Sequence, residues 1–195
     1  MLVMLLSALT DGTFVSRGAP VLAQKGVSLQ AENVKGTRLM KVILLVVGKT
    51  TDKRLAALVD EYAARIGHYV PFEIAVVPDV KGVGRDADTV REAEGQALLR
   101  RIEPADRLVL LDEGGTEMTS RQMAAFVEKR LAMGGKRLVF AVGGATGFAP
   151  SVRNRADDVL SLSRMTMTHQ MVRLFFAEQM YRAFTIIKGE KYHND

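Results

Sequence analysis

Short apolar runs alternate with amphipathic stretches from residue 41 almost to the end of the chain. Five of these runs are apolar in a continuous or alternating manner, as expected of strands buried in a sheet. They lie at 42–47, 72–76, 108–111, 138–142 and 159–162. Because helical patterns separate them, the chain predicts an α/β fold with a doubly wound, mostly parallel sheet and helices on both faces.

Helix signals fill the gaps between the predicted strands. Apolar residues at helical spacing predict helices at about 50–66, 88–102, 119–131 and 169–185, with a short helix starting at Pro150. The candidate N-caps are Thr50, Thr51 or Asp52 for the first helix, Asp88 or Thr89 for the second, and Thr119 or Ser120 for the third. Gly95 inside the second helix costs about 1 kcal/mol relative to alanine and therefore indicates close packing against a neighbour.

Residues 1–39 show neither the apolar pattern of a strand nor that of an amphipathic helix. A short apolar start, 1–9, is followed by scattered glycines and by Asp11, and the apolar run is too short to span a bilayer. A signal peptide ending near Ala23 is one interpretation, although a basic n-region is missing. We expect instead a disordered extension or an upstream start with Met40 as the working initiator, and one domain over 40–195.

Composition narrows the candidate chemistry. The 195 residues include no cysteine, so disulfides and thiolate metal sites are excluded. The three histidines, His68, His169 and His193, are far apart in sequence, which makes a zinc site unexpected, and we predict no metal. The net charge of +5 agrees with a polyanionic partner but does not by itself indicate one.

Three strand ends carry the residues best suited to bind a ligand. Leu111 with Asp112 ends one strand, the glycine-rich run 143–147 ends the next, and 162–167 ends the last. In a parallel sheet these ends share one edge, so the three segments can line one pocket suited to an adenine-bearing cofactor. The glycine patterns at 48 and 143 fit neither a phosphate loop nor a dinucleotide fingerprint. A tight turn without a ligand, with Met165 and Met167 as core residues, is the alternative interpretation.

The stretch 161–173 ends with His169 and Arg173, four residues apart. On one helix face, these two side chains could reach a base or a phosphate. Alternatively, the histidine caps the helix and the arginine pairs with a carboxylate.

The motifs together resemble a known family. They are 40–49, 94–96 (Glu-Gly-Gln), 142–147 (Val-Gly-Gly-Ala-Thr-Gly), 160–173, 178–184 and 192–193 (Tyr-His). In this order, the chain from residue 40 to residue 195 resembles the SPOUT-class ribosomal large-subunit pseudouridine N3-methyltransferases, the RlmH family. The family usually has proline before the histidine, whereas Thr168 stands here and can serve as an N-cap.

The resemblance implies a C-terminal trefoil knot, a homodimer and S-adenosyl-L-methionine as methyl donor. By position, the implied cofactor contacts are Leu111, Gly143, Leu162, Ser163, Arg164, Met165, Thr166 and Met167. The implied substrate is a pseudouridine of large-subunit (23S) rRNA in the assembled ribosome, which makes this a cytoplasmic enzyme without a membrane segment. His169 and Arg173 would then face the RNA, and the tail residues Tyr192 and His193 would close over the pocket or stack on a base.

Two other functions remain open from the sequence. A related knotted methyltransferase acting on tRNA usually has an additional RNA-binding region, for which the chain from Met40 leaves no room. A non-catalytic ribosome-binding factor would keep the fold without the cofactor, which the intact glycine run and 162–167 argue against.

Overall fold

A computed structural model describes residues 40–80 and 86–193 of the chain. Its centre is a sheet of five strands in the order β2-β1-β4-β3-β5, every neighbouring pair parallel. The strands are β1 (Lys41–Val47), β2 (Phe72–Val77), β3 (Arg107–Glu117), β4 (Arg137–Val142) and β5 (Asp158–Ser161). The predicted α/β class and the five strands are confirmed. The expectations for residues 1–39 lie outside the described residues.

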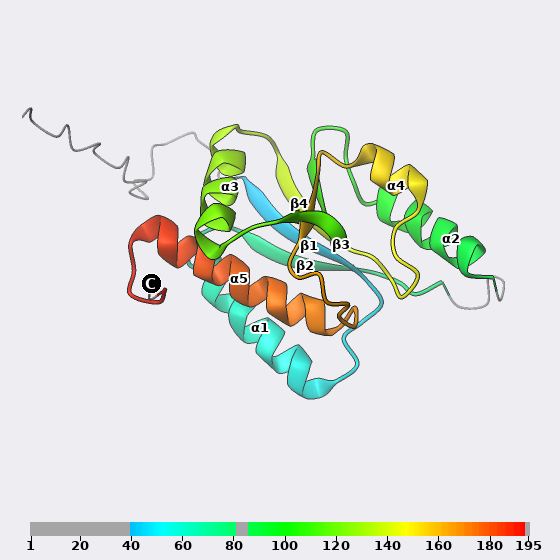
Figure 1. The fold of residues 1–195 in the computed structure, drawn as a ribbon, viewed down its shortest axis with the longest axis horizontal. Coiled ribbons are helices and arrows are strands. Elements are labelled where there is room, and N and C mark those ends of the chain that lie inside the picture. The colour runs from blue at the N-terminus through cyan, green and yellow to red at the C-terminus, as the bar shows by residue number, and fades with distance from the viewer. Residues whose placement is uncertain (1–39, 81–85, 194–195) are drawn as a thin grey trace, which may run out of the picture. The chain divides into compact units, whose positions relative to one another are not determined.

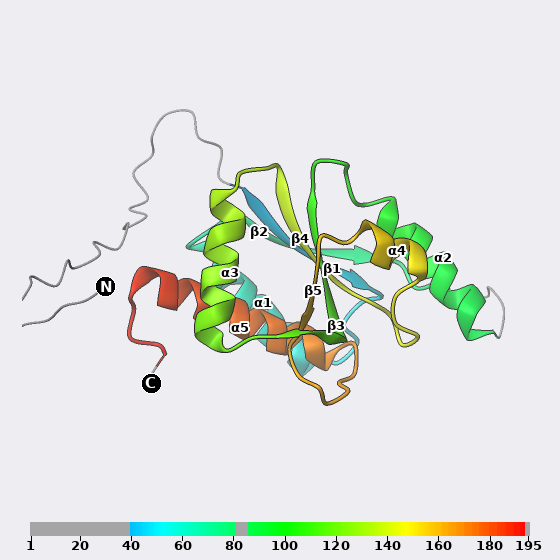
Figure 2. The same ribbon diagram turned by 45° about the horizontal axis from the view of Figure 1, so that its top comes forward.

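Helices cover both faces of the sheet (Figures 1 and 2). The helices α1 (Lys53–Gly67), α3 (Ser120–Ala132) and α5 (Met171–Lys188) share one apolar core with one face of β1, whereas α2 (Ala87–Leu99) and α4 (Pro150–Arg155) share another with the opposite face. Successive β1 side chains point alternately to the two cores: Leu44 to the first, Leu45 to the second. Burial on both faces explains why this strand is continuously apolar.

Gly95 lies where α2 and α4 meet. A Cβ at this position would lie 2.7 Å from the Cβ of Ala149 and 3.1 Å from a methyl carbon of Val152. The close packing predicted from a glycine in a helix interior is therefore confirmed.

The predicted N-caps are correct for two of the helices and wrong for a third. Asp52 caps α1 through its side chain, and Thr119 caps α3 in a capping box with Gln122, both among the predicted candidates. The prediction for α2 was wrong, because Asp86 caps it, accepting from the amide of Thr89, and the helix ends at Leu99 rather than 102.

Helix α5 begins and ends later than predicted, at Met171 and Lys188 instead of 169 and 185. Thr168 accepts a hydrogen bond from the amide of Met171 at 3.2 Å, so this residue caps the turn that leads into the helix. Gly189 ends the helix in the left-handed conformation, with φ of +68°.

Strand β3 does not stop at Leu111 as predicted. Leu111 and Thr116 both pair with Leu160 of β5, so residues 112–115 bulge out of the ladder before pairing resumes. A Cβ at Gly115 would lie only 2.6 Å from the carbonyl carbon of Leu160, which explains why a glycine is needed at this crossing. The polar and glycine residues that suggested a strand end instead form an irregularity inside the strand.

Candidate functional site

A cavity of about 870 Å³ lies at the carboxyl ends of β4 and β5 and at the bulge in β3. Its walls come from three segments, 111–113, 142–148 and 162–170, with further residues from α1, α4 and α5. This is the edge at which open parallel sheets bind ligands, because the loops after neighbouring strands converge there. The volume is within the range of small-molecule sites, roughly 300–1,000 Å³.

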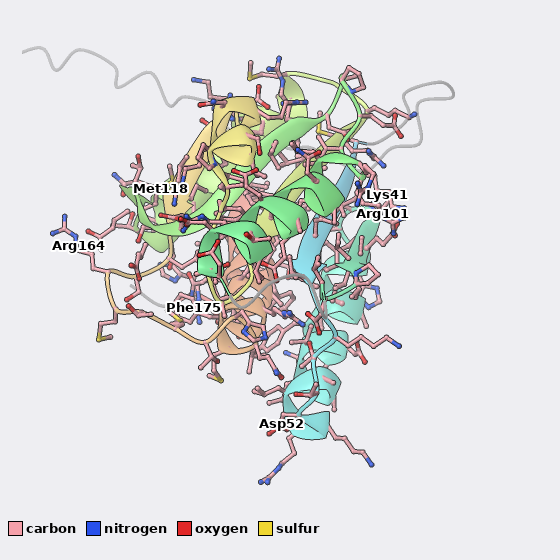
Figure 3. The ribbon with its side chains drawn as sticks, turned by 90° about the vertical axis from the view of Figure 1, so that its right-hand side faces the viewer. Lys41, Asp52, Arg101, Met118, Arg164 and Phe175 are labelled. Atoms are coloured by element: carbon pink, nitrogen blue, oxygen red, sulfur yellow. The ribbon has the colours of Figure 1, made fainter. Side chains whose placement is uncertain are left out.

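The cavity brings together most of the predicted cofactor contacts. Its lining includes Leu111, Gly143, Leu162, Ser163, Met165, Thr166 and Met167. Arg164 is not among the lining residues. Its side chain is 83% exposed and its Nε donates to Glu117 at 2.9 Å. In Figure 3 it points outward from the edge of the 161–170 segment.

The bulge in β3 gives the cavity an acidic mouth. Asp112 accepts from Arg153 at 2.6 Å and from the amide of Gly114 at 3.0 Å, while Glu113 accepts from the hydroxyl of Thr166 at 2.9 Å. Asp112 was among the residues predicted to line the pocket, whereas the next residue, Glu113, was not named. Both follow the buried run that ends at Leu111, and this position is the signal that could have found Glu113.

Two glycines in the 143–147 loop are required by packing within the protein. A Cβ at Gly143 would lie 3.1 Å from the carbonyl group of Gly147, and one at Gly144 would lie 2.2 Å from Oε2 of Glu94. Thr146 of the same loop lines the cavity, and its hydroxyl oxygen is buried without a hydrogen bond to any described residue.

Glu94 lies behind this loop, on α2. The residue is 8% exposed, and its Oε2 has no hydrogen-bond partner within the described ranges. Burial raises the pKa of the carboxyl group, and the negative charge of Asp79 raises it further. Both effects disfavour the charged carboxylate relative to that of an exposed glutamate.

His169 lines the cavity but does not belong to α5. It is partly buried in the turn before the helix, together with Gln170. The Gln170 side chain accepts from the amide of Thr51 at 3.0 Å and from that of Asp52 at 3.4 Å. No local pattern signals Gln170, because its partners are more than a hundred residues away in sequence.

The prediction that His169 and Arg173 share an exposed helix face is wrong. Arg173 is only 1% exposed. Its guanidinium donates to the carbonyl oxygen of Val47 at 2.6 Å and to the hydroxyl of Thr50 at 2.9 Å. Burial lowers the pKa of the guanidinium, opposed by the charge of Asp79. Arg173 thus joins α5 to the end of β1 and does not line the cavity.

The tail residues pack near the other end of α5. The ring of Tyr192 meets that of Tyr181 edge to face at 4.8 Å, and its hydroxyl donates to Glu178 at 3.2 Å. Burial and the neighbouring Tyr62 raise the pKa of the Tyr192 hydroxyl. One ring nitrogen of His193 lies 3.4 Å from the guanidinium of Arg182. Tyr181 is ten residues into α5, about 15 Å from its start, so the tail lies away from the cavity of its own chain.

The described residues contain neither a metal-binding cluster nor a membrane-spanning helix. No group of three or more acidic or histidine side chains in 40–80 and 86–193 is arranged to hold a metal ion. None of the helices described is both long and apolar enough for a bilayer crossing.

Comparison with known proteins gives consistent matches. Residues 40–193 match the family described as "Predicted SPOUT methyltransferase". The chain is 48% identical over 157 residues to the ribosomal RNA large subunit methyltransferase H of Porphyromonas gingivalis, and 46% identical over 157 residues to that of Parabacteroides distasonis. It is 48% identical over 155 residues to the protein of the same name from Geotalea daltonii. Each alignment covers 80% of this chain and 100% of the relative.

Proposed function

Since the chain belongs to the SPOUT methyltransferase family, we propose that it transfers a methyl group from S-adenosyl-L-methionine to large-subunit rRNA. The target proposed is N3 of a pseudouridine in the assembled ribosome, in the cytoplasm. The observation that carries the proposal is the single cavity formed by 111–113, 142–148 and 162–170, the same segments that the family resemblance assigns to the cofactor.

The cavity fits this cofactor in size and chemistry. Leu111, Val142 and Leu162 offer apolar walls for an adenine ring. The backbone of the glycine-rich loop offers hydrogen bonds. The carboxylate of Glu113 at the mouth, which forms no ion pair with any described residue, complements a positively charged donor.

Bound S-adenosyl-L-methionine would supply a methyl group already activated on a sulfonium. The chain therefore needs no nucleophilic side chain; it must align the acceptor nitrogen and exclude water. Pseudouridine N3 carries a proton that has to leave, and a ring nitrogen of His169, on the cavity wall, is the group we assign to accept it. Arg173, also predicted as catalytic, would contribute by holding the β1–α1 loop beside the cavity.

The proposal includes the trefoil knot, with the C-terminal segment threaded through a loop of the chain. In support, 143–147 and 162–170 line the same cavity, although they leave the sheet from β4 and β5, which are not neighbours. Close approach of such segments is what threading requires.

The proposal also includes a homodimer, because the tail of one chain packs away from its own cavity. Catalytic roles for Tyr192 and His193 then require the cavity of a second copy or a rearranged tail. An apolar surface is available for pairing beside the cavity. Met171 is 44% and Phe175 37% exposed, and Phe175 lines a second cavity of about 290 Å³ together with Met118 (Figure 3).

Phe175→Asp tests this pairing surface. A charge placed there should raise the dimer dissociation constant at least tenfold in sedimentation equilibrium, because burying an unpaired carboxylate is costly. Leu58→Asp is the matched control, since Leu58 is an exposed apolar residue of another helix, 43% exposed. A dimer equally stable in both variants would remove this surface from the interface.

The function itself is tested by methyl transfer. Purified protein and S-adenosyl-L-methionine are incubated with assembled ribosomes or with free rRNA, and the labelled nucleoside is identified by mass spectrometry. We expect N3-methylpseudouridine from the ribosomes and much less from free rRNA. Methylation of tRNA instead of rRNA would favour the alternative of a tRNA methyltransferase. Absence of cofactor binding at millimolar concentration would favour a non-catalytic ribosome-binding factor.

A further inference from the structure

Three cations beside the cavity have no side-chain partner within the described part of the chain. Lys49, Lys53 and Arg54 are exposed, and none of them forms an ion pair or side-chain hydrogen bond with any described residue. We call these three residues the basic lip. The one acidic side chain among them, Asp52, is occupied in capping α1, where it accepts from the amides of Arg54 and Leu55.

The basic lip borders the cavity directly. Leu55, the residue after Arg54, lines the cavity. Gln170, another lining residue, bonds to the amides of Thr51 and Asp52 within the same loop. His169 precedes Gln170, so the basic lip lies on the side of the cavity where we place the reacting base.

The loop that carries the basic lip is held in place. Arg173 donates to Val47, the last residue of β1, and to Thr50, and it does so from the buried side. Together with Gln170, it ties the start of α5 to the start of α1. The cations of the lip therefore project from an anchored backbone, which reduces the entropy lost when they engage a partner.

The opposite side of the cavity differs in charge. There Arg153 is paired with Asp112 at 2.6 Å and Arg164 with Glu117 at 2.9 Å, so its cations are already neutralised by neighbouring carboxylates. Figure 3 shows Asp52 and Arg164 well apart. On the lip side, three cations stand against two carboxylates, that of Asp52 and that of Asp79, which lies beside Gly48. A polyanion approaching the cavity would therefore meet net positive charge on that side.

We propose that the basic lip is the phosphate-binding surface for the RNA strand that flanks the methylated base. The inference rests on the proposed function and names which part of the protein holds its substrate. Phosphate contacts fix the position of a nucleic acid without reading its sequence, and each releases counterions. The base would enter the cavity past His169 while Lys49, Lys53 and Arg54 bind the backbone on that side.

The test compares two triple variants of the full chain. In the first, Lys49, Lys53 and Arg54 are changed to Gln; in the control, Arg100, Arg101 and Lys129 are changed to Gln. The control residues are also exposed, with no side-chain partner among the described residues. They lie in the last turn of α3 or just after α2, where the chain returns to the amino ends of strands, and Figure 3 places Arg101 far from Asp52.

Binding to assembled ribosomes is measured across salt concentrations, together with cofactor affinity. The lip variant should lose roughly 2 to 3 from the slope of log K against log salt, about 1 per lost phosphate contact. Its KM for ribosomes should rise at least tenfold, with cofactor affinity unchanged. Each single change to Gln should lower the slope by about 1. The single variants therefore provide the same test if the triple variant folds poorly.

An unchanged slope in the lip variant, or an equal loss in the control, would overturn the inference. A wild-type protein that binds no cofactor or methylates no ribosome would instead contradict the proposed function, so the two failures are distinguishable.

Discussion

The two ends of helix α5 make different kinds of contact. At its start, Arg173 and the preceding Gln170 form hydrogen bonds to the loop between β1 and α1, next to the cavity. Its last turns carry aromatic residues, with Tyr181 packed against Tyr62 at 6.0 Å and against Tyr192 at 4.8 Å.

The two ends of the helix therefore have different roles: one holds the loops around the cavity, and the other holds the C-terminal tail. The first turn holds loops around the cavity with directional hydrogen bonds, which fix positions more strictly than apolar contacts do. The other end holds the tail by ring contacts and by hydrogen bonds of its own, from Tyr192 to Glu178 and from Tyr69 to Glu190. These bonds lie outside the cavity, so we infer that the tail can exchange them for contacts at a cavity, whereas the start of the helix cannot move without disturbing the cavity.

Removal of the tail should produce the largest effect. Deleting 190–195 should abolish methylation of ribosomes, while cofactor affinity and the folded dimer persist, because no tail residue lines the cavity of its own chain. The deletion removes the Tyr181–Tyr192 ring contact and the hydrogen bonds of Tyr192 to Glu178 and of Tyr69 to Glu190, which together should cost about 3 kcal/mol. Single-turnover methylation and calorimetry check both statements, and retained activity would exclude the tail from catalysis.

His169 gives the next largest effect. His169→Ala should lower kcat by roughly 100-fold or more, the usual contribution of a general base, with little change in cofactor affinity. His169→Gln keeps a polar side chain without the ability to take a proton at neutral pH, so it should be equally slow. Activity of the Gln variant close to that of wild type would assign His169 a structural role.

Arg173 should affect stability. Arg173→Met keeps much of the side-chain volume but leaves the carbonyl oxygen of Val47 and the hydroxyl of Thr50 without this donor. We expect the free energy of unfolding in urea to fall by about 2 kcal/mol, the cost of buried groups left unsatisfied. Arg173→Lys, which restores one donor, should recover part of it. An unchanged urea midpoint for the Met variant would show that these bonds contribute nothing net.

Glu94 should give the smallest effect, and one that depends on pH. Because the folded-state pKa is raised above the ordinary value of 4.5, the folded protein binds this proton more tightly than the unfolded chain does. Stability is thus unaffected below pH 4.5 and declines as pH rises through the raised pKa. Glu94→Gln should remove this decline and be more stable than wild type at pH 8 but not at pH 4. Parallel pH profiles for the two proteins would contradict this assignment.

Sequence patterns were sufficient for most of the fold. The strands were recognisable because burial on both faces demands continuous apolar runs such as 42–47. The errors occur where distant contacts decide the outcome. The bulge of β3 depends on the crossing of Gly115 over β5, and the late start of α5 depends on a turn whose side chains bond to the β1–α1 loop.

The candidate site was predictable to the level of segments but not of every side chain. Three strand ends were enough to locate the cavity, because parallel topology fixes their common edge. Arg164 was misplaced because position in a motif does not say which way a side chain points, and Glu117 draws it outward. The inward direction of Arg173 depends on Val47 and Thr50, which no periodicity relates to it.

Cofactor titration into three forms of the protein tests the central claim most directly. Gly143→Ala places a methyl group 3.1 Å from the backbone carbonyl of Gly147, so the loop itself has to shift, whereas Gly67→Ala, with nothing within 4 Å, is the matched control. By isothermal calorimetry, we expect S-adenosyl-L-methionine to bind wild type and Gly67→Ala equally, and Gly143→Ala at least tenfold more weakly. No binding to wild type at millimolar cofactor, or undiminished binding to a folded Gly143→Ala variant, would contradict a cofactor site at this loop.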